Sequence, residues 1–295
     1  METAVHATAA NDTAANSDRT GEARPVLIVL EPTSSLIPVN LRELWGYREL
    51  LYFMVWRDLK VRYKQTMLGA AWVILQPLVM ALVFTIFLGK FARIPSGGIP
   101  YLLLVFSGLV PWMFFSTAVV SSGNSVVGNS HLITKVYFPR LLVPMAAIGG
   151  RLVDFAISFL VVAGLMCYYR VHIGWRLATL PLFVLLLTTL AFGVGTLTAA
   201  WNAKYRDVTI MLPVIVQVWM FVSPIVYPVD IVPVRWRQFY NLNPLVGLIE
   251  GFRSALLNRQ LDVPALLISV AITLVLTVYG LYVFRRMERS FADVV

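Results

Sequence analysis

An uncharged run of 25 residues, Gln65 to Gly89, follows directly on a cluster of four cations between Trp56 and Lys64. A helix needs about 20 apolar residues to cross the hydrocarbon core of a bilayer, and cations with aromatic residues gather at its cytoplasmic surface. The passage from Trp56 to Gly69 is therefore predicted to be the point where the chain leaves the cytoplasm and enters a membrane.

The composition indicates the same class of protein. Charged residues make up only 13% of the 295 positions and hydrophobic residues 59%, whereas soluble domains carry about 25% charged residues. The net charge of +9 would suit a nucleic-acid partner, but the cations lie beside apolar runs, which membrane topology explains better. The single cysteine and the three widely spaced histidines offer neither a disulfide nor a metal site. Neither nucleic acid nor metal is expected.

The apolar runs predict an all-α integral membrane fold with six transmembrane helices. The stretch from Ile94 to Thr134 lacks Lys, Arg, Asp and Glu over 41 residues, too many for one helix, and is predicted to break at Ser121–Ser125. An even number of spans puts both termini on one side, and thirteen cations flank that side against eight on the other. The positive-inside rule then predicts cytoplasmic termini. The predicted spans are residues 68–89, 101–120, 141–169, 177–201, 208–227 and 264–284.

Four segments are predicted along the chain. Residues 1–25 are polar, lack the apolar core of a signal peptide and are expected to form a disordered cytoplasmic tail. Residues 26–64 are expected to form an extended piece and then, from Asn40, an amphipathic helix that lies in the membrane interface. An ordinary amphipathic helix packed on a partner is the alternative. Residues 65–289 hold the six spans, and residues 290–295 form a cytoplasmic tail.

The connection between the fifth and sixth spans is unusual. Residues Asn241–Leu257 are mostly apolar, yet the segment is too short to span and contains Glu250 and Arg253. These two side chains are three positions apart, so they can pair on one helix face. The pattern predicts a re-entrant or short-helix external segment whose ion pair is a candidate gate element. An external loop with an amphipathic helix remains the alternative.

No catalytic or nucleotide-binding motif was found. The chain contains no Gly-x-x-x-x-Gly-Lys-Ser/Thr, no His-Glu-x-x-His and no Gly-x-Ser-x-Gly. Within the predicted spans only Arg151 and Asp154 are charged, three positions apart. They form either a mutually neutralising pair in the bundle interior or a contact for coupling or substrate. Without an ATP site or a proton relay, the chain is predicted to be no enzyme, to bind no cofactor and to take its energy from a partner.

An ordered set of motifs covers about residues 31–289. They are Trp56–Thr66, Leu68-Gly69, Gln76-Pro77, Gly108–Trp112, Lys135–Arg140 with Pro144, Tyr205–Val208, Ser223–Tyr227, Asn243-Pro244 and Phe252-Arg253. In this order they resemble the permease subunits of type-2 ABC exporters in the polysaccharide and O-antigen branch.

The resemblance implies a homodimer in a bacterial inner membrane, bound to two copies of a separate ATPase that holds ATP and Mg. Such transporters contact the membrane lipid and move a glycan, or a glycan linked to undecaprenyl diphosphate, through a channel at the dimer interface. Two alternatives stay open: a type-2 ABC permease for a small drug or lipid, and an ATP-independent carrier or membrane enzyme.

The resemblance also implies that the loop between the second and third spans is the coupling helix that meets the ATPase. Tyr137 and Phe138 are the candidate anchors in a pocket of that partner. A second, weaker contact is expected between the fourth and fifth spans, although either loop could serve topology alone. The candidate coupling residues are Lys135, Val136, Tyr137, Phe138, Pro139, Arg140, Tyr205, Arg206 and Asp207.

Three further sets are candidates for contact with substrate or between helices. The cations suit a lipid diphosphate, although the positive-inside rule also explains them; they are Arg57, Lys60, Arg62 and Lys64. The aromatic residues could line a glycan path, or could be ordinary interface and lipid-facing bulk; they are Trp112, Phe114, Phe115, Trp219 and Phe221. The small residues Ala191, Gly195 and Ala199 predict a close helix contact.

Overall fold

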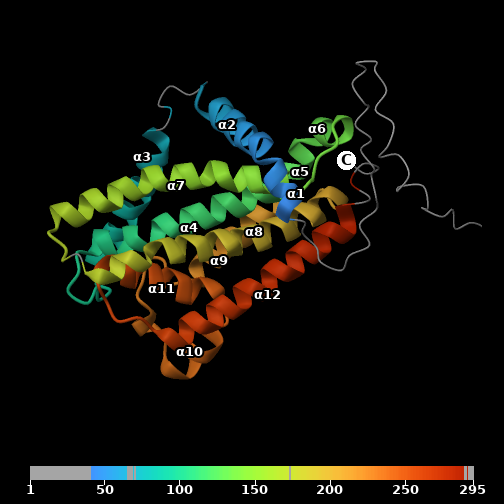
Figure 1. The fold of residues 1–295 in the computed structure, drawn as a ribbon. Coiled ribbons are helices and arrows are strands. Elements are labelled where there is room, and N and C mark those ends of the chain that lie inside the picture. Colours follow the sequence, from blue (N-terminus) through green and yellow to red (C-terminus); the bar gives the residue numbers. More distant parts are fainter. Residues whose placement is uncertain (1–40, 65–68, 70, 173, 289–290, 292–295) are drawn as a thin grey trace, which may run out of the picture. The chain divides into compact units, whose positions relative to one another are not determined.

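The computed structural model describes residues 41–64, 69, 71–172, 174–288 and 291, which form helices joined by turns, without a strand in this part of the chain (Figure 1). The predicted tail 1–25, the extended piece 26–40 with its Asn40 cap, and residues 292–295 lie outside the described residues.

Among the described residues, five helical stretches are long and apolar enough to cross a membrane, which confirms an all-α integral membrane fold. Figure 1 shows α4, α7, α8 and α12 lying lengthwise beside one another. The most extensive helix contacts join α8 to α12 and to α4, and α4 to α7. The five stretches are α3 (Ala71–Phe84) continued by the π-helix η1 (Thr85–Phe91), α4 (Tyr101–Gly123), α7 (Leu142–Tyr168), η2 (Trp175–Thr179) with α8 (Leu180–Lys204), and α12 (Val263–Glu288).

The fifth predicted span is shorter in the structure than in the prediction. Helix α9 (Val208–Phe221) has 14 residues, which is about 21 Å at 1.5 Å per residue, against a hydrocarbon core of about 30 Å. The chain then turns through residues 222–227 instead of continuing as helix. Pro224 has no backbone N–H and disfavours helical geometry at Ser223, so apolar composition alone could not extend the helix to Tyr227.

The segment between α9 and α12 contains the predicted short helices. It begins with the single turn η3 (Val229–Ile231), followed by α10 (Val234–Tyr240) and α11 (Pro244–Leu257). Twelve of the 14 residues of α11 are buried, and the helix packs against α12, α4 and α8. An amphipathic helix on an external loop would bury one face only. The structure therefore favours the short-helix form of the prediction.

The N-terminal helix is broken at Tyr47 into α1 (Leu41–Gly46) and α2 (Arg48–Lys64), and α2 packs along α7. Only Met54 of α2 is buried. Tyr52 and Trp56 are four positions apart on α2 and are 64% and 54% exposed, and Trp45 of α1 is 71% exposed. An exposed aromatic face suits the membrane interface, which stays the predicted position of this helix.

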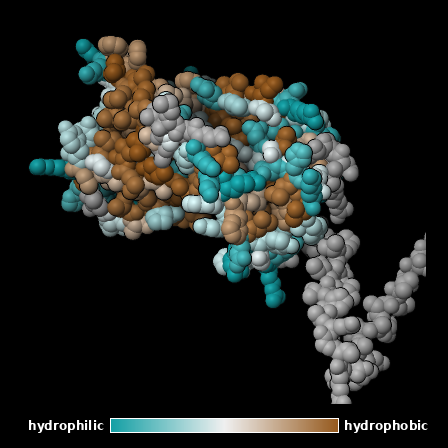
Figure 2. Space-filling view, turned by 90° about the horizontal axis from the view of Figure 1, so that it is seen from above, coloured by the Kyte–Doolittle hydropathy of each residue, from teal (hydrophilic) through white to brown (hydrophobic). Residues whose placement is uncertain are grey.

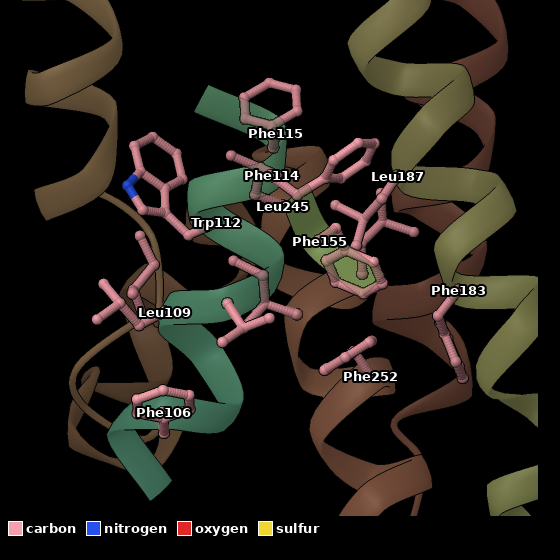
Figure 3. Close-up of a cluster of buried hydrophobic side chains, with 14 of the residues drawn as sticks. Phe106, Leu109, Trp112, Phe114, Phe115, Phe155, Phe183, Leu187, Leu245 and Phe252 are labelled. Carbon is pink, nitrogen blue, oxygen red and sulfur yellow. The ribbon is translucent and has the colours of Figure 1, made fainter. Parts of the chain in front are cut away.

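The core of the bundle is built around α4. Figure 3 shows the rings of Phe106, Phe155, Phe183 and Phe252, which come from α4, α7, α8 and α11, in one buried cluster. The rings of Phe155 and Phe252 meet edge to face with centroids 6.1 Å apart. Such pairs stabilise beyond their buried area.

A second hydrophobic cluster lies at the end of the bundle where α4, α8 and α12 finish and α7 begins. It also takes in the short helices α5 (Ser125–Gly128) and α6 (Ser130–Lys135). We call this the Phe138 end. Its buried residues include Met54, Ile133, Phe138, Leu142 and Phe284.

Small residues let the central helices approach closely, as the stripe at Ala191, Gly195 and Ala199 predicted. All three are buried in α8. A Cβ at Gly195 would lie 2.5 Å from Ser122 Oγ of α4, so a larger residue would not fit there. Small-residue contacts of this kind are common between membrane helices.

Large apolar side chains also cover much of the outer surface. Figure 2 shows a broad apolar area on the face in view. Val79 of α3 and Phe87 of η1 are exposed, as are Ile210, Val214 and Phe221 of α9. A soluble monomer rarely exposes so large a patch, whereas lipid or another membrane subunit covers it without cost.

Candidate coupling and substrate-contact sites

The two aromatic residues of the predicted coupling loop lie in opposite environments. Helix α6 ends at Lys135, and the chain becomes extended at Val136. Tyr137 is 72% exposed, whereas Phe138 is only 5% exposed and packs in the second cluster. Phe138 therefore does not fit the expectation that both rings insert into a partner. It anchors the loop to its own bundle, and Tyr137 alone remains presented.

The rest of the loop is tied down at its end. Pro139 is buried, and the guanidinium of Arg140 donates to the main-chain carbonyl of Glu288 at the end of α12. Lys135 and Val136 are exposed. The loop thus has a fixed base and an exposed outer rim, a geometry that suits a docking contact.

The second predicted contact lies at the same end of the bundle. Tyr205, Arg206 and Asp207 are exposed in the connection between α8 and α9. The ammonium of Lys204 lies 5.2 Å from the centre of the Tyr205 ring, within the range of a cation–π contact.

A buried amide holds these segments together, and sequence reasoning missed it. The Asn202 side-chain nitrogen donates to the carbonyl of Gly123 at 3.0 Å and to Asn124 Oδ1 at 2.9 Å. Its oxygen accepts from the Thr209 hydroxyl at 2.8 Å. Asn202 thus joins the ends of α4 and α8 to the start of α9. Its position within the last turn of an apolar helix is the one signal that could have found it.

The four candidate substrate cations do not act as one group. Arg57 pairs with Asp58 at 2.8 Å and donates to Asn129 Oδ1 at 2.7 Å, so it ties α2 to the segment before α6. Lys60 and Lys64 are exposed on α2. Arg62 instead turns toward the bundle, where it meets the predicted pair on α7.

Asp154 is the centre of a cluster that joins α2 to α7. Arg62 Nη1 lies 2.5 Å and Arg151 Nη1 3.3 Å from Asp154 Oδ2. The Tyr63 hydroxyl donates to Asp154 Oδ1, and Arg151 Nε donates to Ser121 Oγ at 2.9 Å. The predicted pair Arg151–Asp154 is present, but it has a third charged member from the cation cluster.

Tyr63 serves this cluster as a neutral donor. Burial, and then the hydrogen bond to Asp154, raise the pKa of Tyr63 to about 12. The phenol therefore keeps its proton at neutral pH and can donate to an anion beside it.

The predicted pair Glu250–Arg253 is part of a larger clamp. Arg253 Nη1 lies 2.7 Å from Glu250 Oε1, and the Arg253 side chain is fully buried. The same guanidinium donates to acceptors on α4 and on the turn after α9: Ser107 Oγ at 3.3 Å, and the carbonyls of Leu104, Pro224 and Ile225 at 3.4, 3.1 and 3.0 Å. The clamp fastens α11 to both elements.

Three of the five aromatic path candidates lie in the core. Trp112, Phe114 and Phe115 are 4%, 3% and 0% exposed (Figure 3). Trp219 is half-buried and donates from its indole to Asn243 Oδ1 at 2.9 Å. Only Phe221 is well exposed, at 62%. The lining expectation therefore does not fit Trp112, Phe114 and Phe115, because their rings fill the interior of one subunit.

Comparison with known proteins defines the class. The sequence profile of the ABC-2 type transporter family matches residues 49–257, more than half of the chain. The chain belongs to this family, which confirms the resemblance seen in the motifs. It is a multi-pass transporter subunit and not an enzyme; in these systems the ATPase is a separate subunit.

Several named relatives are O-antigen export permeases or polysialic acid transport proteins. The chain is 28% identical to the O-antigen export system permease protein RfbA of Myxococcus xanthus, over 86% of this chain and 98% of the relative. Identity to RfbA of Klebsiella pneumoniae is 27%, over 83% and 95%. Identity to the polysialic acid transport protein KpsM of Escherichia coli is 24%, over 79% and 92%.

Proposed function

We propose that this chain is the channel-forming subunit of an ATP-driven ABC exporter that moves a polysaccharide or lipid-linked glycan, of the O-antigen kind, out of the cytoplasm across the bacterial inner membrane. The observation that carries the proposal is the family match together with similarity over nearly the full length of O-antigen export permeases. ATP-dependent movement of glycan into vesicles that contain the chain and its ATPase tests it.

Two copies of the chain, with two copies of the ATPase, form the working exporter. The interior of one subunit is filled by aromatic side chains such as Phe115 and Phe252, so a glycan needs a path between subunits. Both termini and the Phe138 end face the cytoplasm in this proposal, in line with the cation bias. ATP and Mg bind to the ATPase, because the chain has no nucleotide-binding motif.

The ATPase docks at the Phe138 end. Tyr137 is the side chain offered to a partner pocket, and Phe138 fixes the base from which it projects. The Tyr205–Asp207 rim adds a second contact, which Asn202 holds in register with the first through Asn124 and Thr209. Aromatic side chains at the centre of an interface commonly contribute most of its affinity.

Replacing Tyr137 by alanine is expected to weaken binding of the ATPase by about tenfold or more, because an interfacial aromatic anchor is lost. Binding is measured by titrating the purified ATPase onto the chain in nanodiscs. Tyr168→Ala is the matched control, since Tyr168 is 79% exposed at the opposite end of α7. Unchanged ATPase binding and transport in Tyr137→Ala would remove the coupling assignment.

A further inference from the structure

A cavity of about 200 Å³ lies beside the Asp154 cluster, between α2, α3, α4 and α7. Arg62, Tyr63, Arg151 and Asp154 form its charged and phenolic wall. At about 30 Å³ for each water of bulk liquid, it has room for several waters or a small polar group. The other walls come mainly from α3 and α4 and include Trp72, Gln76, Met113, Phe114 and Thr117.

The cavity carries an excess of positive charge. Two guanidiniums, of Arg62 and Arg151, share a single carboxylate oxygen of Asp154. Among the described residues that line the cavity, Asp154 is the only acidic one. The three side chains are only 28%, 25% and 15% exposed, so water compensates the extra cation poorly. Such a site favours a second anion.

Donor geometry selects the kind of anion. Planar guanidiniums present paired N–H groups that match the oxygens of a phosphate, and two of them face the same cavity. The neutral Tyr63 hydroxyl, already donating to Asp154, adds a third donor group beside them. A phosphate group has enough oxygens to accept from all three, whereas Asp154 offers only two oxygens: Oδ2 is shared by the two guanidiniums, and Oδ1 accepts from Tyr63.

We propose that this cavity binds the phosphate group of a membrane lipid, and that Asp154 occupies the guanidiniums as an internal counterion until the phosphate replaces it. Trp72 and Gln76 at the α3 wall are exposed, next to the apolar outer surface of that helix. A lipid tail can therefore remain in the bilayer while its phosphate enters the cavity. The identity of the lipid rests on the proposed function, in which a diphosphate-linked glycan is the substrate; the anion site itself does not.

Changes of charge at the cluster give opposite predictions. Arg151→Gln and Arg62→Gln remove the excess cation and are expected to weaken phosphate binding by about tenfold. Asp154→Asn removes the competing carboxylate and is expected to strengthen binding several-fold. Arg235→Gln removes the same charge from α10, away from this cavity, and is expected to leave binding unchanged. A purely structural ion pair would instead be damaged by all three changes within the cluster.

The test uses the full chain in detergent, titrated with short-chain phosphatidic acid and, as a control without phosphate, the matching diacylglycerol. Thermal unfolding of each variant identifies any that fail to fold, and a gain of binding in Asp154→Asn cannot arise from misfolding. Equal affinity in all variants, or weaker binding in Asp154→Asn, would overturn the proposal. Inorganic phosphate that binds as tightly and displaces the lipid would support the anion site but contradict its assignment to lipid. Export is not measured, so failure here leaves the proposed function standing.

Discussion

Replacing Arg253 by leucine is expected to destabilise the folded subunit by about 3 to 5 kcal/mol, the usual effect of removing one partner of a buried ion pair. Glu250 would lose its cation at 2.7 Å. The carbonyls of Pro224 and Ile225 would lose their donor as well. Thermal unfolding of the purified chain in nanodiscs, together with its yield from the membrane, measures the effect.

The control for Arg253 is an exposed pair in the same region of the chain. Arg237 lies 3.7 Å from Asp230, and their side chains are 38% and 87% exposed. Exposed pairs contribute at most about 1 kcal/mol, so Arg237→Gln should change the unfolding temperature little. If Arg253→Leu unfolds no earlier than Arg237→Gln, the clamp does not hold α11.

Replacing Gly108 by alanine is expected to destabilise the same region by about 1 to 3 kcal/mol, the usual cost of overpacking. A Cβ at this position would lie 2.4 Å from the carbonyl oxygen of Ile225 and 2.6 Å from Arg253 Nη2. The turn after α9 would have to move away from α4, which would stretch the hydrogen bonds that Arg253 makes. Thermal unfolding again gives the measurement.

Gly164→Ala is the matched control, because a Cβ at Gly164 would meet nothing within 4 Å. In the interior of α7, alanine should raise stability by up to about 1 kcal/mol, since glycine is the poorer helix former. The two substitutions therefore have opposite expected signs. A stabilised Gly108→Ala variant would show that α4 and the turn are not in close contact.

The helices could be predicted because length and the lack of charge are local properties of the sequence. Five of the six predicted spans match long helices in the structure. The prediction of the fifth span was wrong for its C-terminal part, because α9 ends at Phe221, shortly before Pro224, although the apolar run continues. Apolar composition says that a segment avoids water, but not whether it continues as a helix.

Ion pairs within one helix could be predicted from the sequence, whereas an ion pair between two helices could not. Arg151–Asp154 and Glu250–Arg253 could be predicted because residues three apart share a helix face. The contact of Arg62 with Asp154 joins residues 92 positions apart, which only the packing of α2 on α7 brings together.

The aromatic residues were the hardest to place from sequence. Rings in the core of a membrane subunit, such as Trp112 and Phe138, are as hydrophobic as rings that face lipid or a partner. Hydropathy therefore cannot tell a core position from a surface position. In the structure these two side chains are only 4% and 5% exposed, so both belong to the subunit's own core. Tyr137, next to Phe138 in the sequence, has the opposite environment, because the loop packs only Phe138 into the second cluster and leaves Tyr137 72% exposed.

In the proposed function, this chain moves a glycan out of the cytoplasm with energy from a separate ATPase. The direct test uses inverted membrane vesicles that contain the chain and its ATPase. Lipid-linked glycan is supplied at the outer, formerly cytoplasmic, face, and its movement into the vesicles is measured. Glycan is expected to become protected inside the vesicles only when ATP, the ATPase and this chain are all present. Protection of glycan without the ATPase, or ATP-dependent movement of a small drug or lipid but not of glycan, would contradict it.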